Sequence, residues 1–440
     1  MIWVVYNILF AIGFLLMLPK FLWRMKRRGG YAKDFSQRFA RYSPAFQETL
    51  SQGDHIWIHA VSVGEIFVAM KIMEALRRGH PGARFVLSTT TSTGYAIGTE
   101  KIRDPDVLIY FPIDAPPIMR RAFAVIRPKA LILVEAEFWP NLVRRAHRQG
   151  VPIYLVNGRI SPSSFRGYRR LRVFTRRIFP LFDLLCVQSA GDRERLLDLG
   201  APRDRIHVLN SVKYEVADAD PGAEQQAAAV LKRVGFAPDR QVLIGGSTWP
   251  GEEGCLLDAY MTLRDTHSSL ALVLAPRHAE RRADVVDEIT RRGMQCQLRS
   301  ELGEAGSPLP KPPDVFVIDT TGELKHFYPH AALIFIGKSL TSHGGQNIIE
   351  PALHGRPIIV GPNMENFPVV MEDFRGANAI RQVDGEHALP DAIAALLTDP
   401  DAARQMGKNA VVLVRDKRGG IQETVRLIGQ RLYGTEVVNL

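Results

Sequence analysis

Short apolar runs that alternate with segments of helical spacing make up most of this chain. In the first half, the runs predict strands at Ile56–Val61, Phe85–Thr89, Val107–Phe111, Ala130–Glu135, Ile153–Asn157, Leu184–Gln188 and Ile206–Leu209. The second half repeats the pattern at Val242–Gly246, Leu270–Leu274, Val315–Ile318, Leu333–Gly337 and Pro357–Val360. Runs that are apolar throughout are typical of parallel strands covered on both faces. The pattern therefore predicts an α/β protein with two doubly wound parallel sheets, one in each half.

The N-terminus differs from the rest of the chain. Residues 1–19 contain no charged side chain, and the first basic residues after them are Lys20, Arg24, Lys26, Arg27 and Arg28. A cleaved signal peptide has positive charge before its apolar run and small residues after it, and both are missing here. We therefore expect an uncleaved membrane-anchor helix over residues 1–23, with the body in the cytoplasm. Because the run is at the lower limit of length for crossing a bilayer, burial along the membrane surface is the alternative.

The 440 residues exceed what one hydrophobic core usually organises, so two domains follow the anchor. We place the first at residues 24–215 and the second at 216–420, because Asp, Ala, Pro and Gly interrupt the periodic pattern in Val216–Gln226. Residues 421–440 are expected to form a C-terminal helix that returns to the first domain. The break at Gly303–Pro313 is interpreted as an internal loop.

Composition narrows the kind of partner. The formal net charge of +10 and the pI near 9.6 favour an anionic partner, such as nucleic acid, a nucleotide or an acidic membrane surface. Lys and Arg are spread along the chain without an aromatic-interleaved basic repeat, so no nucleic acid is expected. The three cysteines are too few and too far apart for a zinc knuckle or a disulfide framework.

The segment His59-Ala-Val-Ser-Val-Gly-Glu65 reads as strand, tight turn and helix. Gly64 permits a backbone conformation that other residues resist and leaves the approach to the helix open. Glu65 then falls in the first helical turn, where unpaired N–H groups and the helix dipole favour its ionised form. A carboxylate at the carboxyl edge of a strand is well placed to accept a proton. A simple capping role for Glu65 is an equally good reading of this segment alone.

Two further carboxylates, Glu135 and Glu137, lie at the end of the predicted strand Ala130–Glu135 and just beyond it. Glu135 and Glu137 are followed by Phe138, Trp139 and a helix-starting Pro140. Alternation along an extended chain puts both carboxylates on one face, and burying them unpaired costs too much. We therefore expect them to be solvated or functional. After another strand, Asn210 tolerates a left-handed turn, which would aim Lys213 back into a cleft.

Four polar segments follow strands in the second half. They are Gly245–Glu253, Pro276-Arg277-His278, Thr321-Gly322-Glu323-Leu324 and Gly344–Pro351. Backbone N–H groups at a helix start suit a phosphate, and an arginine grips one with two hydrogen bonds. Glu350 is suited to accept ribose hydroxyls. Each segment alone is compatible with a turn, but four at one edge of a sheet indicate a nucleotide site.

Two partial motifs point elsewhere. Gly337-Lys338-Ser339 looks like the end of a phosphate-binding P-loop, but Ala332 occupies the position of its leading glycine. Ala60–Gly64 approaches the nucleophile elbow of hydrolases with Ala60 in place of glycine, so an esterase using Ser62 is an alternative function. No dinucleotide-binding glycine fingerprint is present, which disfavours a dehydrogenase.

These segments, in this order and over nearly the whole chain, resemble the 3-deoxy-D-manno-octulosonic acid (Kdo) transferases of lipopolysaccharide synthesis. The resemblance implies a GT-B fold, with two Rossmann-like domains facing a central cleft behind an N-terminal membrane-anchor helix. It implies transfer of Kdo from the donor substrate CMP-Kdo to the lipid A precursor, lipid IVA, at the bacterial inner membrane, without a metal or cofactor. An alternative is a membrane-bound CMP-sugar-binding protein without turnover.

The resemblance also assigns roles to residues. Glu65 matches the general base of the family, and Glu135 and Lys213 match positions that support the transition state. The residues that match the CMP site are Pro276, Arg277, Thr321, Gly322, Glu323, Asn347, Ile348, Ile349 and Glu350. The chain departs from the family pattern at Gln37, Trp249, Gln346 and Asn210.

Overall fold

The computed structural model describes residues 2–28, 34–51, 53–215, 220–236, 240–303 and 308–434, with backbone only for 20–28 and 51. Parts of the expected linker Val216–Gln226, of the expected loop Gly303–Pro313 and of the C-terminal segment 421–440 therefore lie outside the described residues, as do the side chains from Lys20 to Arg28. Contacts divide the chain into two units, Met1–Val212 with Gly419–Leu440, and Lys213–Arg418. The break falls where Val212 packs into the core of the first unit and Tyr214 into that of the second.

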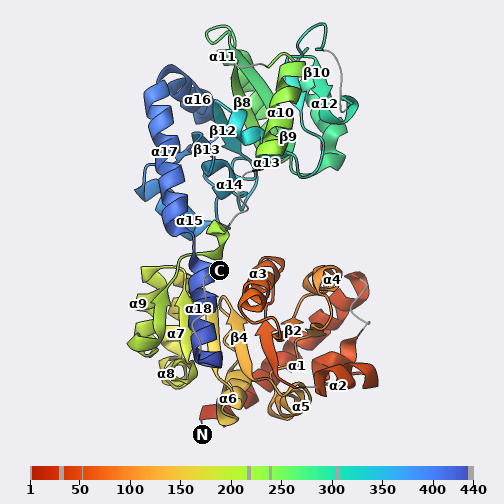
Figure 1. Ribbon diagram of the computed structural model, residues 1–440, viewed down its shortest axis with the longest axis vertical. Helices are drawn as coiled ribbons and strands as arrows, with labels where there is room; N and C mark the ends of the chain where they lie inside the picture. Colours follow the sequence, from red (N-terminus) through yellow and green to blue (C-terminus); the bar gives the residue numbers. More distant parts are fainter. Residues whose placement is uncertain are drawn as a thin grey trace. The chain divides into compact units, whose positions relative to one another are not determined.

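The first unit contains a seven-stranded parallel sheet in the order β3-β2-β1-β4-β5-β6-β7 (Figure 1). Its strands are β1 His55–His59, β2 Arg84–Thr89, β3 Val107–Tyr110, β4 Ala130–Val134, β5 Ile153–Gly158, β6 Leu184–Val187 and β7 Ile206–Val208. Along β1, Trp57 packs into one core cluster while Ile56 and Ile58 pack into another. The sheet is therefore buried on both faces, as the uninterrupted apolar runs predict.

The second unit repeats this architecture in the order β10-β11-β9-β8-β12-β13-β14. Its strands are β8 Gln241–Thr248, β9 Leu270–Pro276, β10 Cys296–Leu298, β11 Val315–Val317, β12 Leu333–Ile336, β13 Ile358–Val360 and β14 Arg381–Gln382. All twelve predicted strands are present, and the two parallel sheets are confirmed. The pattern missed β10 and β14 because both are short edge strands whose residues are not buried.

Helices cover both faces of each sheet (Figure 1). In the first unit they are α1 Ile2–Arg28, α2 Pro44–Ser51, α3 Val63–Gly79, α4 Ser92–Lys101, α5 Pro116–Ile126, α6 Pro140–Arg148, α7 Pro162–Arg170, α8 Arg172–Ile178, α9 Ala190–Asp198 and α18 Gly420–Tyr433. In the second they are α10 Pro221–Arg233, α11 Glu252–Leu263, α12 Arg282–Arg291, α13 Leu324–Phe327, α14 Ile349–Ala352, α15 Pro368–Gly376, α16 Leu389–Thr398 and α17 Pro400–Lys417. Hydroxyl caps from Ser62, Thr91 and Ser189 satisfy the first N–H groups of α3, α4 and α9.

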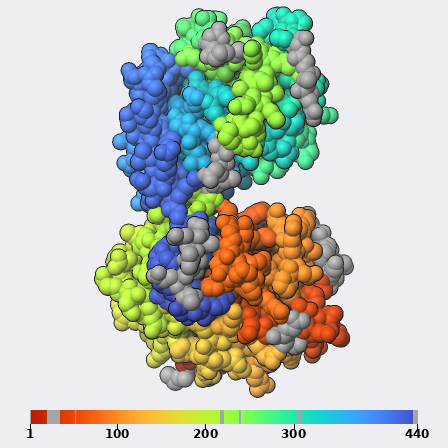
Figure 2. Space-filling view, in the orientation of Figure 1, coloured from red at the N-terminus to blue at the C-terminus, as the bar shows by residue number. Residues whose placement is uncertain are grey.

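The short 3-10 helices are η1 Phe35–Phe39, η2 Phe179–Leu181, η3 Arg203–Arg205, η4 Val212–Tyr214, η5 Ala279–Arg281, η6 Arg299–Glu301, η7 Tyr328–His330 and η8 Glu386–Ala388. Helix α18 belongs to the first unit although it follows the whole of the second in sequence. Its Ile421, Val425 and Ile428 join the same core cluster as Ile58 and Ile66. Figure 2 shows part of this blue segment among the yellow-green and orange surfaces of the first unit.

In each sheet the strand order reverses direction once. In the first unit β1 to β3 lie on one side of the sheet and β4 pairs with the other side of β1, and in the second unit β8 to β11 lie on one side and β12 pairs with the other side of β8. The reversal lies between β1 and β4 in the first unit and between β8 and β12 in the second. Ligands of open α/β sheets bind outside the carboxyl ends of the strands at such a switch point.

Candidate active site

Glu65 lies at the switch point of the first sheet. It is the third residue of α3, only 8% exposed, and its Oε2 accepts a 2.8 Å hydrogen bond from the Val61 N–H. The Glu65 N–H in turn donates to the Ser62 hydroxyl at 3.4 Å. The Ser62 hydroxyl thus caps α3, and the Glu65 carboxylate reaches back past this N-cap to the preceding residue, so Glu65 takes part in closing the helix start and its carboxylate is held in one place. Gly64 is helical, not left-handed, but an added side chain there would meet only the Ser62 hydroxyl, at 4.0 Å.

Glu135 begins the loop that follows the neighbouring strand. The prediction that Glu135 and Glu137 share a face of an extended chain is wrong, because Glu135 has φ +61° and turns the chain immediately after β4. A non-glycine residue in this region is strained, and such strain gathers at functional sites. The Asn157 amide, which follows β5, donates to Glu135 Oε1 at 3.3 Å.

Glu137 nevertheless lies near the other two carboxylates. The pKa of Glu137 is raised to about 7, first by burial and then by the charges of Glu65 and Glu135, against the lowering effect of a 2.7 Å hydrogen bond from the Trp139 indole N–H. Three carboxylates from β1–α3 and β4–α6 are thus gathered at one switch point. A raised pKa that results from burial and like charge is a feature of catalytic sites.

His59 is a neighbour that the sequence did not single out. Its Nδ1 lies 3.0 Å from the Ser88 hydroxyl and 3.1 Å from the Ser88 carbonyl, and its Nε2 is 3.9 Å from Glu137 Oε2. Complete burial lowers the pKa of His59 to about 3, so the ring is neutral at physiological pH. The strand β1 contains two buried histidines, His55 and His59, and no sequence signal distinguishes His59 from an ordinary core residue.

The esterase alternative does not fit the backbone at Ser62. A nucleophile elbow is a strained turn, whereas Ser62 has extended φ and ψ of −99° and 165°. Its hydroxyl serves as the cap of α3. The geometry is therefore that of a helix start.

Lys213 belongs to the second unit, in η4. The predicted left-handed turn at Asn210 is present, with φ +62°. The Lys213 ammonium donates to the Asn366 carbonyl and lies 4.4 Å from the centre of the Phe367 ring. Its predicted catalytic role is not tested by these contacts and stays a prediction.

In the second unit the predicted donor residues follow neighbouring strands. Pro276 ends β9, Arg277 is exposed directly after it, and the Arg277 N–H donates to the Thr248 carbonyl of β8 at 3.0 Å. Thr321, Gly322 and Glu323 follow β11, the next strand outward. The segment from Asn347 to Glu350 follows β12 on the other side of β8. The sheet order therefore brings these segments to one edge.

Glu323 and its neighbours form a local network. Arg299 Nη2 donates to Glu323 Oε1 at 2.9 Å, and the Thr320 hydroxyl donates to its other oxygen. Gly322 has φ +88°, a conformation that favours glycine, and Thr321 is exposed beside it. This turn is preorganised, although its role as a nucleotide contact is not tested.

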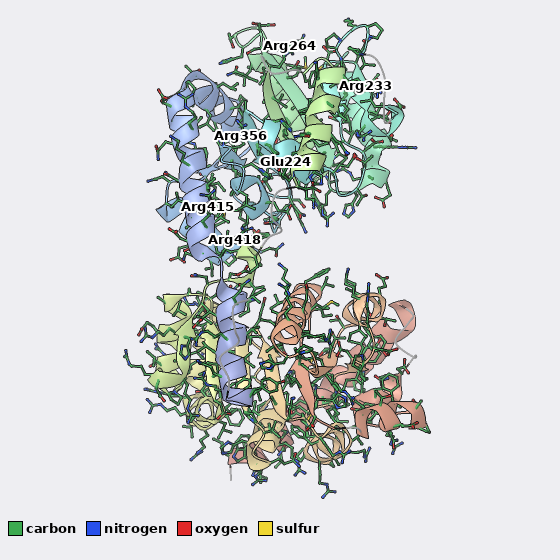
Figure 3. All side chains as sticks on the ribbon, in the orientation of Figure 1. Glu224, Arg233, Arg264, Arg356, Arg415 and Arg418 are labelled. Atoms are coloured by element: carbon green, nitrogen blue, oxygen red, sulfur yellow. The ribbon has the colours of Figure 1, made fainter. Side chains whose placement is uncertain are left out.

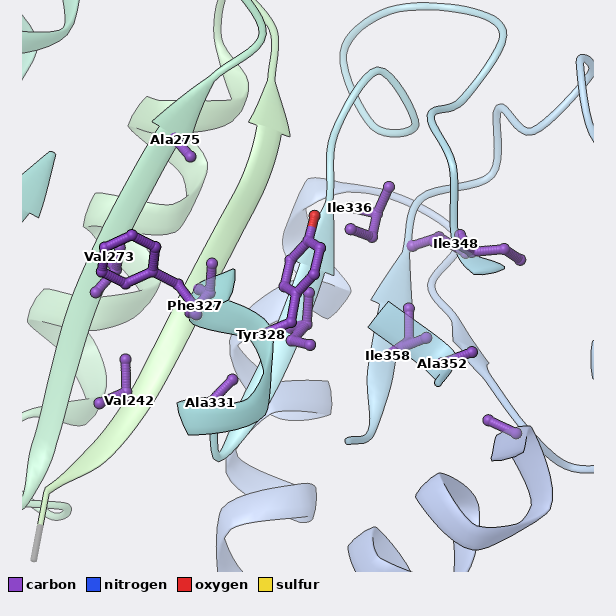
Figure 4. Packing of buried hydrophobic residues seen from close by; sticks show 14 of the residues in the cluster. Val242, Val273, Ala275, Phe327, Tyr328, Ala331, Ile336, Ile348, Ala352 and Ile358 are labelled. Carbon is purple, nitrogen blue, oxygen red and sulfur yellow. The ribbon is translucent and has the colours of Figure 1, made fainter. Parts of the chain in front are cut away.

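The Asn347–Glu350 segment combines core and exposed groups. Ile348 and Ile349 are fully buried, and Figure 4 shows Ile348 among the apolar side chains that include Ile358 and Ala352. Only their backbone groups are available for a ligand. Asn347 Oδ1 accepts the Ile349 N–H at 3.0 Å. Burial first, and the Glu350 carboxylate second, raise the pKa of Tyr328, which places Glu350 beside that ring.

A cation–aromatic group stands at the switch point of the second sheet. Lys338, with φ +57°, follows β12 and holds its ammonium 4.4 Å from the centre of the Trp249 ring. The His278 ring meets Trp249 edge-on at 5.7 Å between centroids. Sequence reasoning treated Trp249 only as a departure and Lys338 only as a false P-loop, because the pairing joins loops that are far apart in the chain.

A buried carboxylate at the start of α11 joins the loops after β8 and β12, while the phosphate role predicted for the N–H groups of this helix start stays a prediction. Glu252 is fully buried, and its carboxylate accepts N–H groups from Trp249, Lys338, Ser339 and Leu340 at 2.7–2.9 Å. These amides are thus occupied by a side chain of the protein. Gly337 permits the approach, since an added Cβ there would lie 2.6 Å from Glu252 Oε2.

The remaining observations concern the distribution of charge, apolar helices and possible metal ligands. Among the arginines of the second unit that Figure 3 labels, Arg233 lies in α10 and Arg415 in α17, whereas Arg264 directly follows α11. Over the residues that the structure describes, one helix, within Ile2–Pro19, is long and apolar enough to cross a membrane, with a mean hydropathy of 2.1. In the same described part of the chain, no group of three or more His, Cys, Asp or Glu side chains is placed to hold a metal ion.

Comparison with known proteins agrees with this architecture. Residues 33–216 match the family described as 3-Deoxy-D-manno-octulosonic-acid transferase (kdotransferase). A 3-deoxy-D-manno-octulosonic acid transferase of Bordetella pertussis is 33% identical over 421 residues, which cover 92% of this chain and 94% of that protein. The transferase of Haemophilus influenzae is 27% identical over 401 residues, or 90% and 91% of the two chains.

The fold has more distant solved relatives. Anabaena Alr3699/HepE, in complex with UDP, superposes with a TM-score of 0.54 at 12% identity, covering 87% of this chain and 100% of that chain. At this identity the likeness concerns the two-domain GT-B fold alone. Taken with the identity to the Bordetella pertussis protein, these findings show that the chain belongs to the 3-deoxy-D-manno-octulosonic acid transferase family and is a glycosyltransferase.

Proposed function

We propose that the protein transfers Kdo from CMP-Kdo to lipid IVA, with Glu65 as general base and without a metal ion. In this reaction a hydroxyl of the acceptor attacks the anomeric carbon of Kdo, and its proton passes to the Glu65 carboxylate. The bond between that carbon and the phosphate oxygen breaks, and CMP leaves with the electron pair. Family membership supports the class of reaction, and the placement of Glu65 supports its role as the base.

The placement of Glu65 carries the proposal. A general base needs one fixed carboxylate at the edge where ligands bind, and its position must be maintained before substrate arrives. The hydrogen bond from the Val61 N–H supplies that position through one oxygen. Gln in place of Glu would preserve this bond, so the chemistry of the carboxylate is separable from its structural role.

The second unit is proposed to bind the donor. CMP leaves as a phosphate monoester, and a guanidinium next to backbone N–H groups stabilises such charge without a metal. Arg277 is exposed at the carboxyl edge of β9, beside the Lys338–Trp249 pair. We assign Glu350 and Asn347 to the ribose, and Thr321 to Glu323 to the remaining polar groups of CMP.

The acceptor is proposed to arrive from a membrane. The apolar helix α1 belongs to the unit that carries Glu65, and the net charge of +10 suits an anionic lipid surface. We propose that the protein acts at the cytoplasmic side of the bacterial inner membrane.

The decisive experiment incubates the purified protein with CMP-Kdo and lipid IVA in mixed micelles, followed by mass analysis of the lipid. We expect a mass increase that corresponds to addition of Kdo and an equal release of CMP, unchanged by EDTA. CMP release without a change in the lipid would contradict the acceptor. Loss of transfer in EDTA, restored by a divalent cation, would contradict the metal-free mechanism.

A further inference from the structure

An apolar cavity of about 570 Å³ lies in the first unit, next to the carboxylate cluster. One wall is the start of α1, the opposite wall is α8 with the end of α7, and the floor is the loop from Ala136 to Pro140. This loop carries Glu137 and Trp139, which ties the cavity to the switch point of the first sheet. The volume is within the range of small-molecule sites in proteins.

Helix α1 is fixed to the first unit by specific contacts. The Tyr6 hydroxyl donates to Asp114 at 3.0 Å, and the Asn141 side-chain amide donates to Asn7 Oδ1 at 2.8 Å. The Trp3 and Phe174 rings meet edge-on at 5.5 Å, which joins α1 to α8 directly. These polar and aromatic contacts make the α1 wall part of the folded unit.

The two faces of α1 differ. Trp3, Tyr6, Asn7, Phe10 and Phe14 are spaced as one helical stripe and are partly covered. A second stripe consists of large aliphatic residues that are 48–76% exposed, namely Val4, Val5, Ile8, Leu9, Ile12, Leu15, Leu16 and Met17. Val5 and Leu9, at one border of this stripe, line the cavity. Across from them, Leu171 and Val173 are 60% and 69% exposed.

The exposed apolar surface continues from the mouth of the cavity along α1, the helix with the composition of a membrane span. An apolar surface of this kind is typical of a site that binds an apolar molecule. The cavity wall also carries few hydrogen-bonding groups, so a peptide backbone or a sugar would lose hydrogen bonds with water and gain few in return. A fatty acyl chain has no such cost. A lipid layer presents such chains, and α1 has the length and composition of a helix that enters one.

We propose that this cavity holds a fatty acyl chain of the lipid acceptor, so that the acceptor sugar is presented to Glu65. The inference rests on the proposed function, because it specifies how the same acceptor is bound. Residues of α1 and α8 then favour binding of an acylated sugar over a sugar without acyl chains. The loop that carries Glu137 sets the distance between the acyl chain and the reacting hydroxyl.

The test uses two variants in which a larger side chain reduces the volume of the cavity, Leu9→Trp on α1 and Val173→Trp on α8. Both side chains are exposed at the rim, so the substitutions leave the core untouched. Leu16→Trp is the matched control, because Leu16 is 76% exposed on the same stripe but does not line the cavity. Each variant is assayed with CMP-Kdo and either lipid IVA or its chemically deacylated form, at fixed detergent, and CMP binding is measured by calorimetry.

We expect the KM for lipid IVA to rise about tenfold or more in both rim variants, the size of effect that a few displaced methylene groups produce in an apolar site. Activity on the deacylated acceptor, CMP affinity and the Leu16→Trp control should match wild type. Unchanged KM for lipid IVA in both rim variants would overturn the inference. A rim variant that loses vesicle binding while keeping its KM in micelles would overturn it too, and would assign the cavity to bulk membrane lipid. Failure of the proposed function is distinct, since wild type would then transfer Kdo to neither acceptor.

Discussion

Glu65 and Glu252 occupy corresponding places in the two units, yet their surroundings differ. Each follows the first strand of a parallel sheet, lies in the first turn of the next helix and faces the switch point. Glu65 accepts one backbone N–H, from Val61, through one oxygen. Glu252 accepts four, through both oxygens, and joins the loop after β8 to the loop after β12.

The difference is the one expected between a structural carboxylate and a carboxylate that is proposed to act as a base. The four amides around Glu252 use the acceptor capacity that a ligand or a proton would need, and the side chain is fully buried. Glu65 is 8% exposed, and the charge of its carboxylate acts on the nearby Glu137. The same sequence feature, a glutamate at a helix start, therefore has two different surroundings, and we propose that the number of N–H donors separates the structural role from the chemical one.

The units also differ in the charged groups they present. The first gathers three carboxylates, Glu65, Glu135 and Glu137, whereas the corresponding edge of the second sheet carries the cations Lys338 and Arg277 in addition to Glu323 and Glu350. An acidic edge suits proton removal from an acceptor, whereas a basic edge suits a departing phosphate. The four predictions below test this division of roles.

The largest effect is expected for Glu65→Gln. The amide keeps the hydrogen bond from Val61 but cannot take a proton, so turnover should fall by about 10²- to 10⁴-fold, the usual contribution of a positioned base. Thermal stability and CMP affinity should match wild type. Glu74→Gln is the matched control, because Glu74 lies on the same helix and its side chain is 69% exposed. Near-normal turnover in Glu65→Gln would remove Glu65 from the chemistry.

Glu252→Gln should mainly affect folding. One amide oxygen replaces two carboxylate oxygens, and the new NH₂ group faces backbone N–H donors, so about two buried N–H groups lose their acceptor. At roughly 1–3 kcal/mol each, the free energy of unfolding should fall by about 3 kcal/mol. Urea denaturation measures it, with Glu65→Gln as the comparison. Equal stability of the two variants would contradict the distinction drawn between the two glutamates.

Glu137→Gln should change how stability depends on pH. Glu137 has a pKa of about 7 in the folded protein against 4.5 unperturbed, so the wild-type protein loses stability as the pH rises from about 4.5 to above 7. The full difference corresponds to about 3 kcal/mol. The variant should therefore gain stability relative to wild type over this interval, measured by urea denaturation at pH 5 and pH 8. A difference that does not grow with pH would contradict the assignment.

The smallest effect concerns the donor side. Arg277→Ala should weaken CMP binding by about tenfold or somewhat more, the loss of one charge-assisted hydrogen bond to phosphate. Arg264→Ala is the control, because Arg264 is exposed after the end of α11, at the opposite edge of the sheet. Calorimetry with CMP decides it. Equal affinity in the two variants would remove Arg277 from the donor site.

Much of the site could be located from sequence because it lies at the ends of buried strands. Apolar runs predicted the strands β1, β4, β9 and β11. The polar residues that follow these strands include Glu65, Glu135, Arg277 and Glu323. Parallel strands end at a shared edge, so these residues were expected to lie near one another within a unit. The motif order and the relatives then identified the family.

Other features depend on residues that are distant in the chain. The left-handed turn at Glu135, not strand alternation, sets the direction of the two carboxylates after β4. The hydrogen bonds from the loops after β8 and β12 to Glu252 require that these two strands be neighbours. No local sequence pattern predicts that pairing. The edge strands β10 and β14 were missed because pairing with one neighbour needs no apolar run.

Local apolar periodicity and short motifs were enough to predict two doubly wound sheets, the apolar N-terminal helix, the candidate base and the family. Contacts between distant segments were needed to find which glutamate is surrounded by amides, that burial beside Glu65 raises the pKa of Glu137, and that α1 and α8 line a cavity. Desolvation, hydrogen-bond saturation and cavity shape depend on which distant segments meet in space, and a linear pattern does not contain that information.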